Sequence, residues 1–440
     1  MTDGTTVVLA PVARNERIDV LDMLRGIAIL GIFFMNIPFM AAELSKIFVA
    51  PQLIGWSPTD AALWMTVQVL LEGTQRGLLE LLFGAGMMVL TRHAMTPDGP
   101  VGVADLFFRR NWWLLFFGLV DIFVLGWAGD ILHVYAIAAL LLFPFRKMKP
   151  RWLLVLGLGF ALFIGVTGGV RYAERVDLLH RAEAAIAKQD SGAKLSKAET
   201  KTIEDWKKAV ESRKGNSPEF KEIREQEKKG HESALGYIMF NIGSYIFFVF
   251  ESLPMSVGEA FCTMLIGIAF WKWGIIQGQR SSRFYWGLMA LCYAFAFPLR
   301  YAAGLEHQVL APEPRSFWIT QEIARIAVSV GHVALINLMV RGRIGAMVLA
   351  PFKAAGRTAF SLYFMQQIIG IWILFAPWGP GLWSKLSWTQ MYAVALAVIA
   401  AQLVIANLWV KLFAMGPLEW AWRSLSYMKR QPFLKRPETP

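Results

Sequence analysis

Long apolar runs follow one another along nearly the whole chain, and they constrain the fold more than any other feature. A helix rises about 1.5 Å per residue, so roughly 20 apolar residues cross about 30 Å of hydrocarbon. Runs close to this length occupy residues 20–42, 61–90, 111–128, 130–146, 151–171, 255–275, 284–304, 317–341, 357–378 and 388–413. We therefore predict an all-α, polytopic transmembrane helical bundle of about ten spans in a lipid bilayer.

Composition supports a membrane protein over a nucleic-acid-binding one. Hydrophobic residues make up 56% of the 440 residues, which is more than an ordinary soluble fold carries. The net charge of +12 comes from short basic clusters between the apolar runs, so we predict topology signals and no nucleic-acid partner. The chain has two cysteines, Cys262 and Cys292, both within apolar runs, so a disulfide framework is not predicted.

The basic clusters predict the orientation of the spans. They all fall in short loops on one side, which the positive-inside rule assigns to the cytoplasm together with both termini. The clusters are Arg14, Arg17 and Arg25; Arg92, Arg109 and Arg110; Arg146 to Arg151; Lys272 to Arg283; Arg341 to Arg357; and Lys429 to Arg436. The opposite short loops carry little positive charge.

A polar stretch interrupts this rhythm at residues 172–233. We predict an extracytoplasmic helical insertion there, between an N-terminal transmembrane half at 1–171 and a C-terminal half at 234–440. A solvated cap or spacer is the simpler interpretation of its role. Residues 235–253 are apolar enough for an eleventh span, but a span there would move Lys272 to Arg283 outside. We therefore predict a helix lying at the outer interface before Pro254.

The first span carries polar groups at a suggestive spacing. Arg25 and Asn36 are eleven residues apart, which places them on nearly the same helix face, about 16 Å apart along the axis. Asp22 is one turn from Arg25 and can pair with it. The alternative is that Asp22 and Arg25 anchor the helix at the interface while Asn36 joins two helices.

Further ionisable groups lie in the second span. Glu72 and Arg76 are four residues apart, a spacing that suits an ion pair, and Glu80 follows one turn later. Charges within a span are costly and are functional candidates for that reason. Gly84 and Gly86 do not form a nucleotide-binding loop, because neither a preceding strand nor a following Lys-Ser or Lys-Thr is present.

The fourth span begins with a carboxylate and an imidazole one turn apart. Asp130 can orient His133 and stabilise its charged form, which suits a general base near neutral pH. Asp121 can join this cluster; the alternative is a helix cap beside a solvated histidine. His332 lies within a span, where hydrogen bonding between helices is the more common role. Sequence spacings typical of metal sites, serine hydrolases or nucleotide-sugar enzymes do not occur, so no metal is predicted.

Five motifs together resemble a known family. They are "LDMLRGIAILGIFFMN", "RGLLELLFGAG", "GDILHVYAIAALLLFPFR", "GRTAFSLYFMQQII" and "GPLEWAWRSLSY", in this order. The chain resembles the YeiB-like family, domain of unknown function 418, over nearly its whole length outside the polar insertion. The family has no settled biochemical role.

A more distant similarity concerns the transmembrane acyltransferases. The spacing from Arg25 to Asn36 is similar to the first helix of that superfamily, which includes the lysosomal heparan-alpha-glucosaminide N-acetyltransferase and bacterial O-acetyltransferases of cell-surface sugars. The bacterial sugar enzymes have histidine at the second position, and the lysosomal type has asparagine. The lysosomal catalytic histidine has no counterpart between Asn36 and His93.

This resemblance implies an acyltransferase in the bacterial cytoplasmic (inner) membrane. Acetyl-CoA or another acyl-CoA is the implied co-substrate, and the implied acceptor is a hydroxyl or amine of an extracytoplasmic sugar or envelope component. The expected phosphate-binding residues are Arg25, Arg76, Arg109 and Arg110, and the expected catalytic residues are Asn36, Asp130 and His133. The expected acceptor-binding residues are Glu72, Asp121 and His332.

Two other functions stay open on the sequence. In a secondary transporter, the intramembrane charges would mark a substrate or proton pathway, although the chain shows no internal repeat or matched pair of broken helices. In a structural or regulatory protein, the insertion would be a docking surface. The sequence does not decide between a monomer and a homodimer, and it names neither the acyl group nor the acceptor.

Overall fold

The computed structural model describes residues 18–91, 101–215 and 217–435. In these residues the regular elements are helices, and the β-type pairing is one isolated antiparallel bridge between Phe413 and Leu434. The α-helices are α1 (Asp19–Gly31), α2 (Phe33–Ala41), α3 (Leu44–Val49), α4 (Pro58–Leu70), α5 (Thr74–Thr91), α6 (Val101–Phe123), α7 (Leu132–Leu142), α8 (Pro150–Gly157), α9 (Gly159–Asp190), α10 (Lys197–Arg213), α11 (Pro218–Gly230), α12 (Ala234–Ser244), α13 (Leu253–Lys272), α14 (Ser282–Gln308), α15 (Phe317–Arg341), α16 (Arg343–Arg357), α17 (Ala359–Gln367), α18 (Trp388–Leu412) and α19 (Pro417–Tyr427). Two π-helical turns, η5 (Tyr245–Val249) and η6 (Ile368–Leu374), extend α12 and α17.

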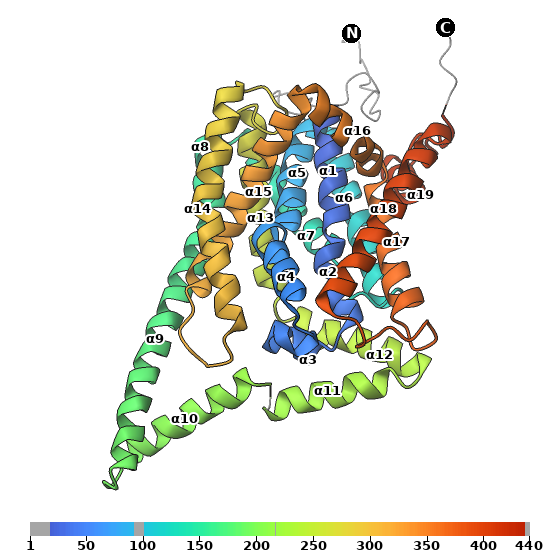
Figure 1. Ribbon diagram of the computed structural model, residues 1–440. Helices are drawn as coiled ribbons and strands as arrows, with labels where there is room; N and C mark the ends of the chain where they lie inside the picture. The colour runs from blue at the N-terminus through green and yellow to red at the C-terminus, as the bar shows by residue number, and fades with distance from the viewer. Residues whose placement is uncertain (1–17, 92–100, 216, 436–440) are drawn as a thin grey trace.

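The all-α bundle predicted from the sequence is confirmed. Each predicted apolar run is occupied by a helix or by a pair of consecutive helices. Figure 1 shows most of these helices side by side between two ends of the molecule. We call the end at which α1 begins and α19 lies the terminal end, and the end at which α3, α11 and α12 lie the opposite end.

Six helical segments are long and apolar enough to cross a membrane by length and composition. They are Asp19–Ala41, Pro150–Asp190, Leu253–Lys272, Ser282–Gln308, Phe317–Arg341 and Trp388–Leu412. The other four predicted runs are broken, short or charged: α4 and α5 are separated at 71–73, α7 has 11 residues, α17 changes to a π-helix, and α6 carries charges near both ends. These four runs therefore do not combine the length and the apolar character of the six segments.

Loops with basic residues meet at the terminal end. Lys272, at the end of α13, donates to the carbonyl of Met148 before α8, at 2.7 Å. Arg341, at the end of α15, donates to Gly278 at 2.9 Å and to Ser282 at 2.7 Å. Three of the predicted basic loops therefore share one end of the bundle, as the positive-inside pattern requires.

Glycines allow the central helices to approach closely. A Cβ atom at Gly26 of α1 would overlap the backbone oxygen of Phe352 in α16, and one at Gly356 would overlap that of Asp22. In the same way, a Cβ atom at Gly84 of α5 would overlap the backbone oxygen of Met264 in α13, and one at Gly267 of α13 would overlap that of Leu81 in α5. These contacts use small residues at helix crossings, as is typical of membrane bundles, and explain Gly84 without a nucleotide.

The polar insertion is built from helices that project beyond the bundle. In Figure 1, α9 continues past the opposite end, and α10 and α11 return beneath the bundle. Helix α9 passes through residues 171–172 without a break, so its apolar and polar halves form one rod. The insertion is attached by Glu227 of α11, whose two carboxylate oxygens each accept a bond from the Leu44 amide at 3.1 Å.

Residues 234–249 lie across the opposite end. Figure 1 shows α12 there beside α11. Tyr237 of α12 donates to the carbonyl of Ile371 at 3.0 Å, and the contact of Lys272 with Met148 places the far end of α13 at the terminal end. This arrangement agrees with the predicted interfacial helix and does not add an eleventh crossing.

Candidate functional site: two cavities that meet inside the bundle

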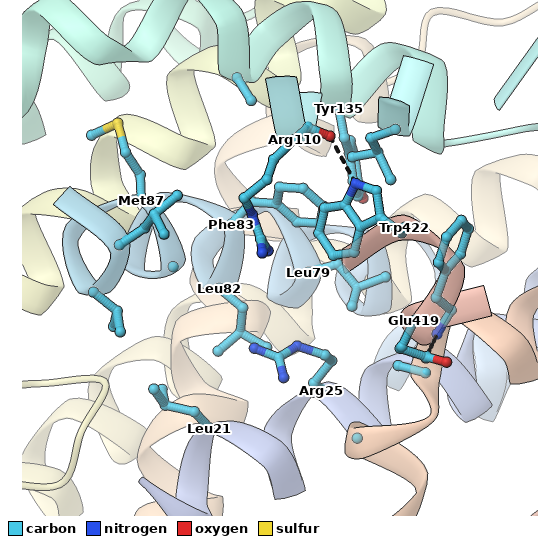
Figure 2. A pocket seen from close by; sticks show the side chains of 18 of the residues that line it. Leu21, Arg25, Leu79, Leu82, Phe83, Met87, Arg110, Tyr135, Glu419 and Trp422 are labelled. Atoms are coloured by element: carbon cyan, nitrogen blue, oxygen red, sulfur yellow. Dashed lines mark hydrogen bonds between the residues drawn. The ribbon is translucent and has the colours of Figure 1, made fainter. Parts of the chain in front are cut away.

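A cavity of about 330 Å³ lies toward the terminal end, and we call it the terminal cavity. Its walls come from α1, α5, α6, α7, α17 and α19. Apolar side chains of α5 such as Leu79, Leu82 and Phe83 form one side, and Tyr135 of α7 is nearby (Figure 2). Polar groups enter from the other helices, so the cavity combines a mostly apolar wall with a few charges, the usual composition of a ligand site.

Arginines dominate the polar groups of the terminal cavity. Arg25 of α1 and Arg110 of α6 extend into it (Figure 2), and Arg357 and Arg423 also line it. Arg25 pairs with Asp22 at 2.9 Å, which confirms the pair predicted from their spacing. Arg110 lies 4.2 Å from the ring centre of Trp422, and the Trp422 indole donates to the Arg110 carbonyl at 2.8 Å.

The C-terminal motif closes this cavity. Glu419 of α19 accepts bonds from the amides of Phe360 at 2.6 Å and Ser361 at 3.2 Å, and from the Ser361 hydroxyl at 2.6 Å. These amides belong to the first turn of α17, where backbone N–H groups have no partner within the helix. A carboxylate there accepts their hydrogen bonds and interacts favourably with the positive end of the helix dipole. Glu419 therefore fixes α19, and with it Trp422 and Arg423, over the cavity.

A second cavity, of about 320 Å³, lies toward the opposite end, and we call it the opposite cavity. Its walls include α2, the start of α5, residues 127–131, α12 and the loop that holds Trp383. Asn36 lines it and is 9% exposed, and its side-chain NH₂ has no hydrogen-bond partner among the described residues. A buried amide without a partner is costly, so Asn36 has donors available for a ligand.

His231 also lines the opposite cavity. Its ring stacks on Trp383 with centres 3.6 Å apart, and its Nδ1 contacts the Glu227 carbonyl at 2.9 Å. That contact requires the proton on Nδ1, which leaves the lone pair on Nε2, and Nε2 has no partner in the described structure. Burial lowers the pKa of His231, so the ring is neutral at physiological pH and Nε2 can accept a proton.

The two cavities meet at one residue and share a wall. Ile131 lines both of them. Beside it, the Tyr135 hydroxyl in the terminal cavity donates to the backbone carbonyl of Arg76 at 3.0 Å, and Arg76 lines the opposite cavity. Arg25 and Asn36 lie on either side of this wall, in separate cavities, although one continuous helical region carries both.

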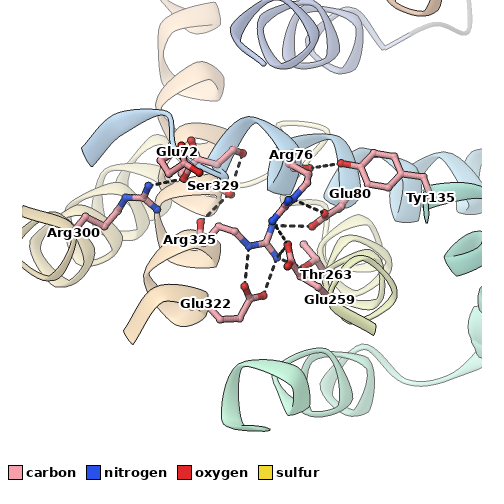
Figure 3. Close-up of polar contacts among 11 residues, drawn as sticks. Glu72, Arg76, Glu80, Tyr135, Glu259, Thr263, Arg300, Glu322, Arg325 and Ser329 are labelled. Atoms are coloured by element: carbon pink, nitrogen blue, oxygen red, sulfur yellow. Dashed lines mark hydrogen bonds and ion pairs between the residues drawn. The ribbon is translucent and has the colours of Figure 1, made fainter. Parts of the chain in front are cut away.

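A buried charge network supports the wall (Figure 3). Arg325 of α15 binds Glu322 at 2.8 Å, Glu80 at 2.8 Å and Glu259 at 3.2 Å. Arg76 binds Glu259 at 2.6 Å and lies 3.7 Å from Glu80. The network joins α5, α13 and α15, and each guanidinium faces at least two carboxylates.

The predicted pair of Glu72 and Arg76 is not the one that forms. Glu72 lies in the turn between α4 and α5, where Gly73 has a φ of 68°, so the two residues are not on one helix. Arg76 pairs with Glu259 and Glu80 instead, while Arg300 of α14 donates to the backbone carbonyls of Glu72 and Gln68. The predicted ion pair of Glu72 with Arg76 was therefore wrong, because it assumed that one helix carries both residues. Glu72 does line the opposite cavity.

Asp130 and His133 form the predicted pair in the buried interior. His133 Nδ1 lies 2.8 Å from Asp130 Oδ2, and Tyr363 donates to Asp130 Oδ1 at 3.3 Å. Asp121 is fully buried next to Asp130, as predicted. His133 is 1% exposed, its Nε2 has no partner among the described residues, and it is absent from the lining of both cavities. Its catalytic role stays a prediction.

Comparison with known proteins finds a family similar to part of the chain. Residues 270–429 match the family described as "Protein of unknown function (DUF418)". The matched region includes α19 with Glu419 and Trp422, which close the terminal cavity.

Full-length relatives are bacterial and uncharacterised. The chain is 29% identical to "Uncharacterized protein YxaH" of Bacillus subtilis, over 97% of this chain and 98% of the relative. It is 25% identical to an "Uncharacterized 39.9 kDa protein in amylase 3'region" of Bacillus acidopullulyticus (97% and 99%), and 22% identical to "Uncharacterized protein YeiB" of Escherichia coli (96% and 99%). No solved structure matches the chain.

Besides Asp121, Asp130 and His133, two other predicted site residues lie outside both cavities. Arg109 neighbours Arg110 but points elsewhere, pairing with Asp105 at 2.8 Å. His332 bonds to the Tyr293 hydroxyl at 2.7 Å and to the Leu70 carbonyl at 2.9 Å, which fits the alternative of hydrogen bonding between helices. Arg76 lines the opposite cavity, away from Arg25 and Arg110.

Other residues near the two cavities were missed by sequence reasoning. His231 falls in a loop without ligand spacing, and its cavity is assembled from five distant parts of the chain. Glu259, Glu322 and Arg325 lie in apolar runs, where the rule that intramembrane charges are functional candidates could have found them. No group of three or more possible metal ligands occurs in the described residues.

Proposed function

We propose that this protein is an acyltransferase that works across the membrane. It moves an acyl group from acyl-CoA in the terminal cavity to a hydroxyl or amine in the opposite cavity. The observation that carries the proposal is the pair of cavities, nearly equal in volume, that meet at Ile131 and differ in their polar groups. An enzyme whose donor and acceptor lie on opposite sides of a membrane needs one cavity for each substrate and a point inside the bundle where the two cavities meet.

The terminal cavity is suited to the donor. Arg25 and Arg110 offer guanidinium groups that can bind the phosphates of CoA through charge-assisted, bidentate hydrogen bonds. The apolar wall of α5 accommodates the pantetheine arm and the acyl chain. Because the basic loops lie at this end, it faces the cytoplasm, where acyl-CoA is made, in a bacterial inner membrane.

The opposite cavity supplies groups for the transfer step. The acceptor oxygen or nitrogen attacks the thioester carbonyl, its proton passes to an imidazole, and the C–S bond breaks to release CoA. Asn36 donates to the oxyanion that develops on the carbonyl. His231 is the base that the geometry favours, because it lines this cavity and its Nε2 has no hydrogen-bond partner among the described residues. His133 is the base predicted from sequence, so both need testing.

Binding of acyl-CoA tests the donor site. Acetyl-CoA is titrated into the purified full-length protein in detergent by calorimetry. Arg110→Gln is compared with Arg109→Gln, because the two arginines are neighbours on α6 and only Arg110 lines the terminal cavity. Removing one charge-assisted contact weakens binding by about 1.5–3 kcal/mol, which is roughly a tenfold to hundredfold rise in Kd.

The outcome separates donor binding from general charge. Saturable binding that is weakened in Arg110→Gln and retained in Arg109→Gln supports acyl transfer. Equal weakening in both variants indicates nonspecific attraction of an anion to a basic surface. No binding by a monodisperse wild-type sample removes the proposal.

A secondary transporter is the second candidate, and one observation favours it. Arg76 connects the opposite cavity to buried carboxylates of the charge network, as expected for a proton or ion pathway. In a transporter, the wall at Ile131 would open alternately toward each cavity. Saturable uptake of a solute into proteoliposomes, abolished by Glu259→Gln, would favour transport over acyl transfer.

A further inference from the structure

A third cavity, of about 210 Å³, lies outside the two described above. It forms where α9, α10 and the loop between α14 and α15 come together. These three elements lie near one another at the lower edge of the bundle in Figure 1. Four arginines line it: Arg171 and Arg175 from α9, Arg213 from α10 and Arg315 from the loop.

Backbone oxygens occupy part of this arginine cluster. Arg213 donates to the carbonyls of Val309 at 3.0 Å and His307 at 2.7 Å, and Arg175 donates to that of Pro312 at 2.9 Å. Arg171 lies over the Trp318 ring, 4.3 Å from its centre. Carbonyl dipoles and an aromatic ring orient these guanidinium groups without cancelling their charge.

Nearby carboxylates do not balance the four positive charges. Glu306 uses one oxygen to accept from the Ser316 amide at 2.8 Å and the other to accept from the Phe317 amide at 3.0 Å. Glu313 lines the cavity but is exposed. Burial lowers the pKa of Arg213 to about 10, and the like charge of the neighbouring Arg315 adds to this effect.

Position relates the cluster to the membrane boundary. The apolar part of α9 ends at Arg171, and its side chains Leu162, Val166 and Val170 are 69%, 60% and 54% exposed. Such a face suits contact with lipid tails. Gly168 brings α9 against the backbone of Trp318, so the arginines and the tryptophan lie together at the level where headgroups begin.

We propose that this cavity binds a phosphate group. Guanidinium groups match phosphate oxygens in pairs, and four arginines near two carboxylates, Glu306 and Glu313, keep an excess of positive charge that favours a compact anion. Because the cavity lies where the apolar part of α9 ends, the phosphate of an anionic phospholipid headgroup is the source that its position favours. Bound there, it joins the insertion to the bundle at α9, α10 and the loop before α15.

The test compares two sets of substitutions in the full-length protein in detergent. Arg171→Gln combined with Arg315→Gln removes two charges while Arg175 and Arg213 keep their bonds to the loop carbonyls. Arg181→Gln is the control, because Arg181 is further along α9 and pairs with Asp177 at 2.6 Å. Phosphatidylglycerol and phosphatidylcholine retention is measured by native mass spectrometry, inorganic phosphate binding by calorimetry, and folding by thermal unfolding.

We expect the double variant to bind phosphatidylglycerol about tenfold or more weakly for each lost arginine contact, and Arg181→Gln to match the wild type. Loss confined to phosphatidylglycerol identifies a lipid headgroup, and loss of inorganic phosphate binding alone identifies a soluble phosphate. Equal binding by all three proteins overturns the proposal, as does a wild type that binds neither probe. Acetyl-CoA binding in the terminal cavity is measured separately and does not affect this result.

Discussion

The terminal and opposite cavities are nearly the same size, yet their polar groups differ in kind. The terminal cavity, about 330 Å³, contains the guanidinium groups of Arg25 and Arg110. The opposite cavity, about 320 Å³, offers the Asn36 amide and the His231 imidazole, and its one arginine, Arg76, is held by glutamates. Volume therefore does not distinguish the two sites, and charge does.

This difference shows when an arginine inside the bundle is available to a ligand. Arg76 and Arg325 share Glu80 and Glu259, and Arg325 also binds Glu322, so both guanidinium charges are already paired with carboxylates inside the protein. Such a network costs desolvation and makes sense as a support for the wall between the cavities. Arg110 faces a cavity against an aromatic ring, where a phosphate can approach it.

The largest expected effect comes from breaking the supporting network. Arg325→Met leaves Glu80, Glu259 and Glu322 buried with Arg76 as their remaining cation. Removing one partner of a buried ion pair costs about 3–5 kcal/mol, so we expect a clear loss of the free energy of unfolding in mixed micelles. Lys353→Met, which removes an exposed pair with Asp19, is the control and should change little. A loss below about 1 kcal/mol would show that the network does not support the fold.

The next effect separates the two cavities by function. Asn36→Ala should lower acyl transfer by about 10²–10³-fold, because it removes one donor to the developing oxyanion. Acetyl-CoA affinity should be unchanged, since Asn36 lies in the opposite cavity. His231→Gln should lower turnover in the same way and flatten the pH–rate profile. If transfer is unaffected by either change while His133→Ala abolishes it, the base predicted from sequence is the correct one.

A third prediction concerns the attachment of the insertion beside the opposite cavity. Burial raises the pKa of Glu227 to about 8, although the bond from the Leu44 amide partly opposes this. The folded state then holds a proton that the unfolded state has lost, so stability falls as the pH rises from about 4.5 to about 8. Glu227→Gln should remove this dependence in thermal unfolding at pH 6 and 8. A Gln variant with the wild-type slope would show that another group is responsible.

The smallest expected effect is a difference in salt dependence. Arg25 has a side chain that is 38% exposed, so part of its attraction for CoA phosphates is screened by ions. Raising NaCl from about 0.1 M to about 1 M, which shortens the Debye length from about 10 Å to about 3 Å, should weaken acetyl-CoA binding several-fold. Binding of a neutral acceptor in the opposite cavity should not change. Salt-independent acetyl-CoA binding would argue against phosphate recognition by arginine.

Local sequence patterns predicted several contacts correctly. The pairs of Asp22 with Arg25 and of Asp130 with His133 are three residues apart on or beside one helix, and both form. The spacing of Glu72 and Arg76 failed because Gly73 takes a positive φ and ends the helical register between them. Helical spacing predicts a side-chain pair reliably only where one helix carries both residues, and a single turn between them removes the expected contact.

The sequence by itself determined the membrane class, the positions of the apolar segments, the side on which basic loops gather and the family motifs. Those properties follow from hydropathy and local charge, which act along the chain. Only the tertiary structure decided that Arg325 meets glutamates from α5 and α13, that His231 stacks on Trp383, and that Arg25 and Asn36 face separate cavities joined at Ile131. Each depends on how helices far apart in sequence cross, which packing and buried polar contacts specify.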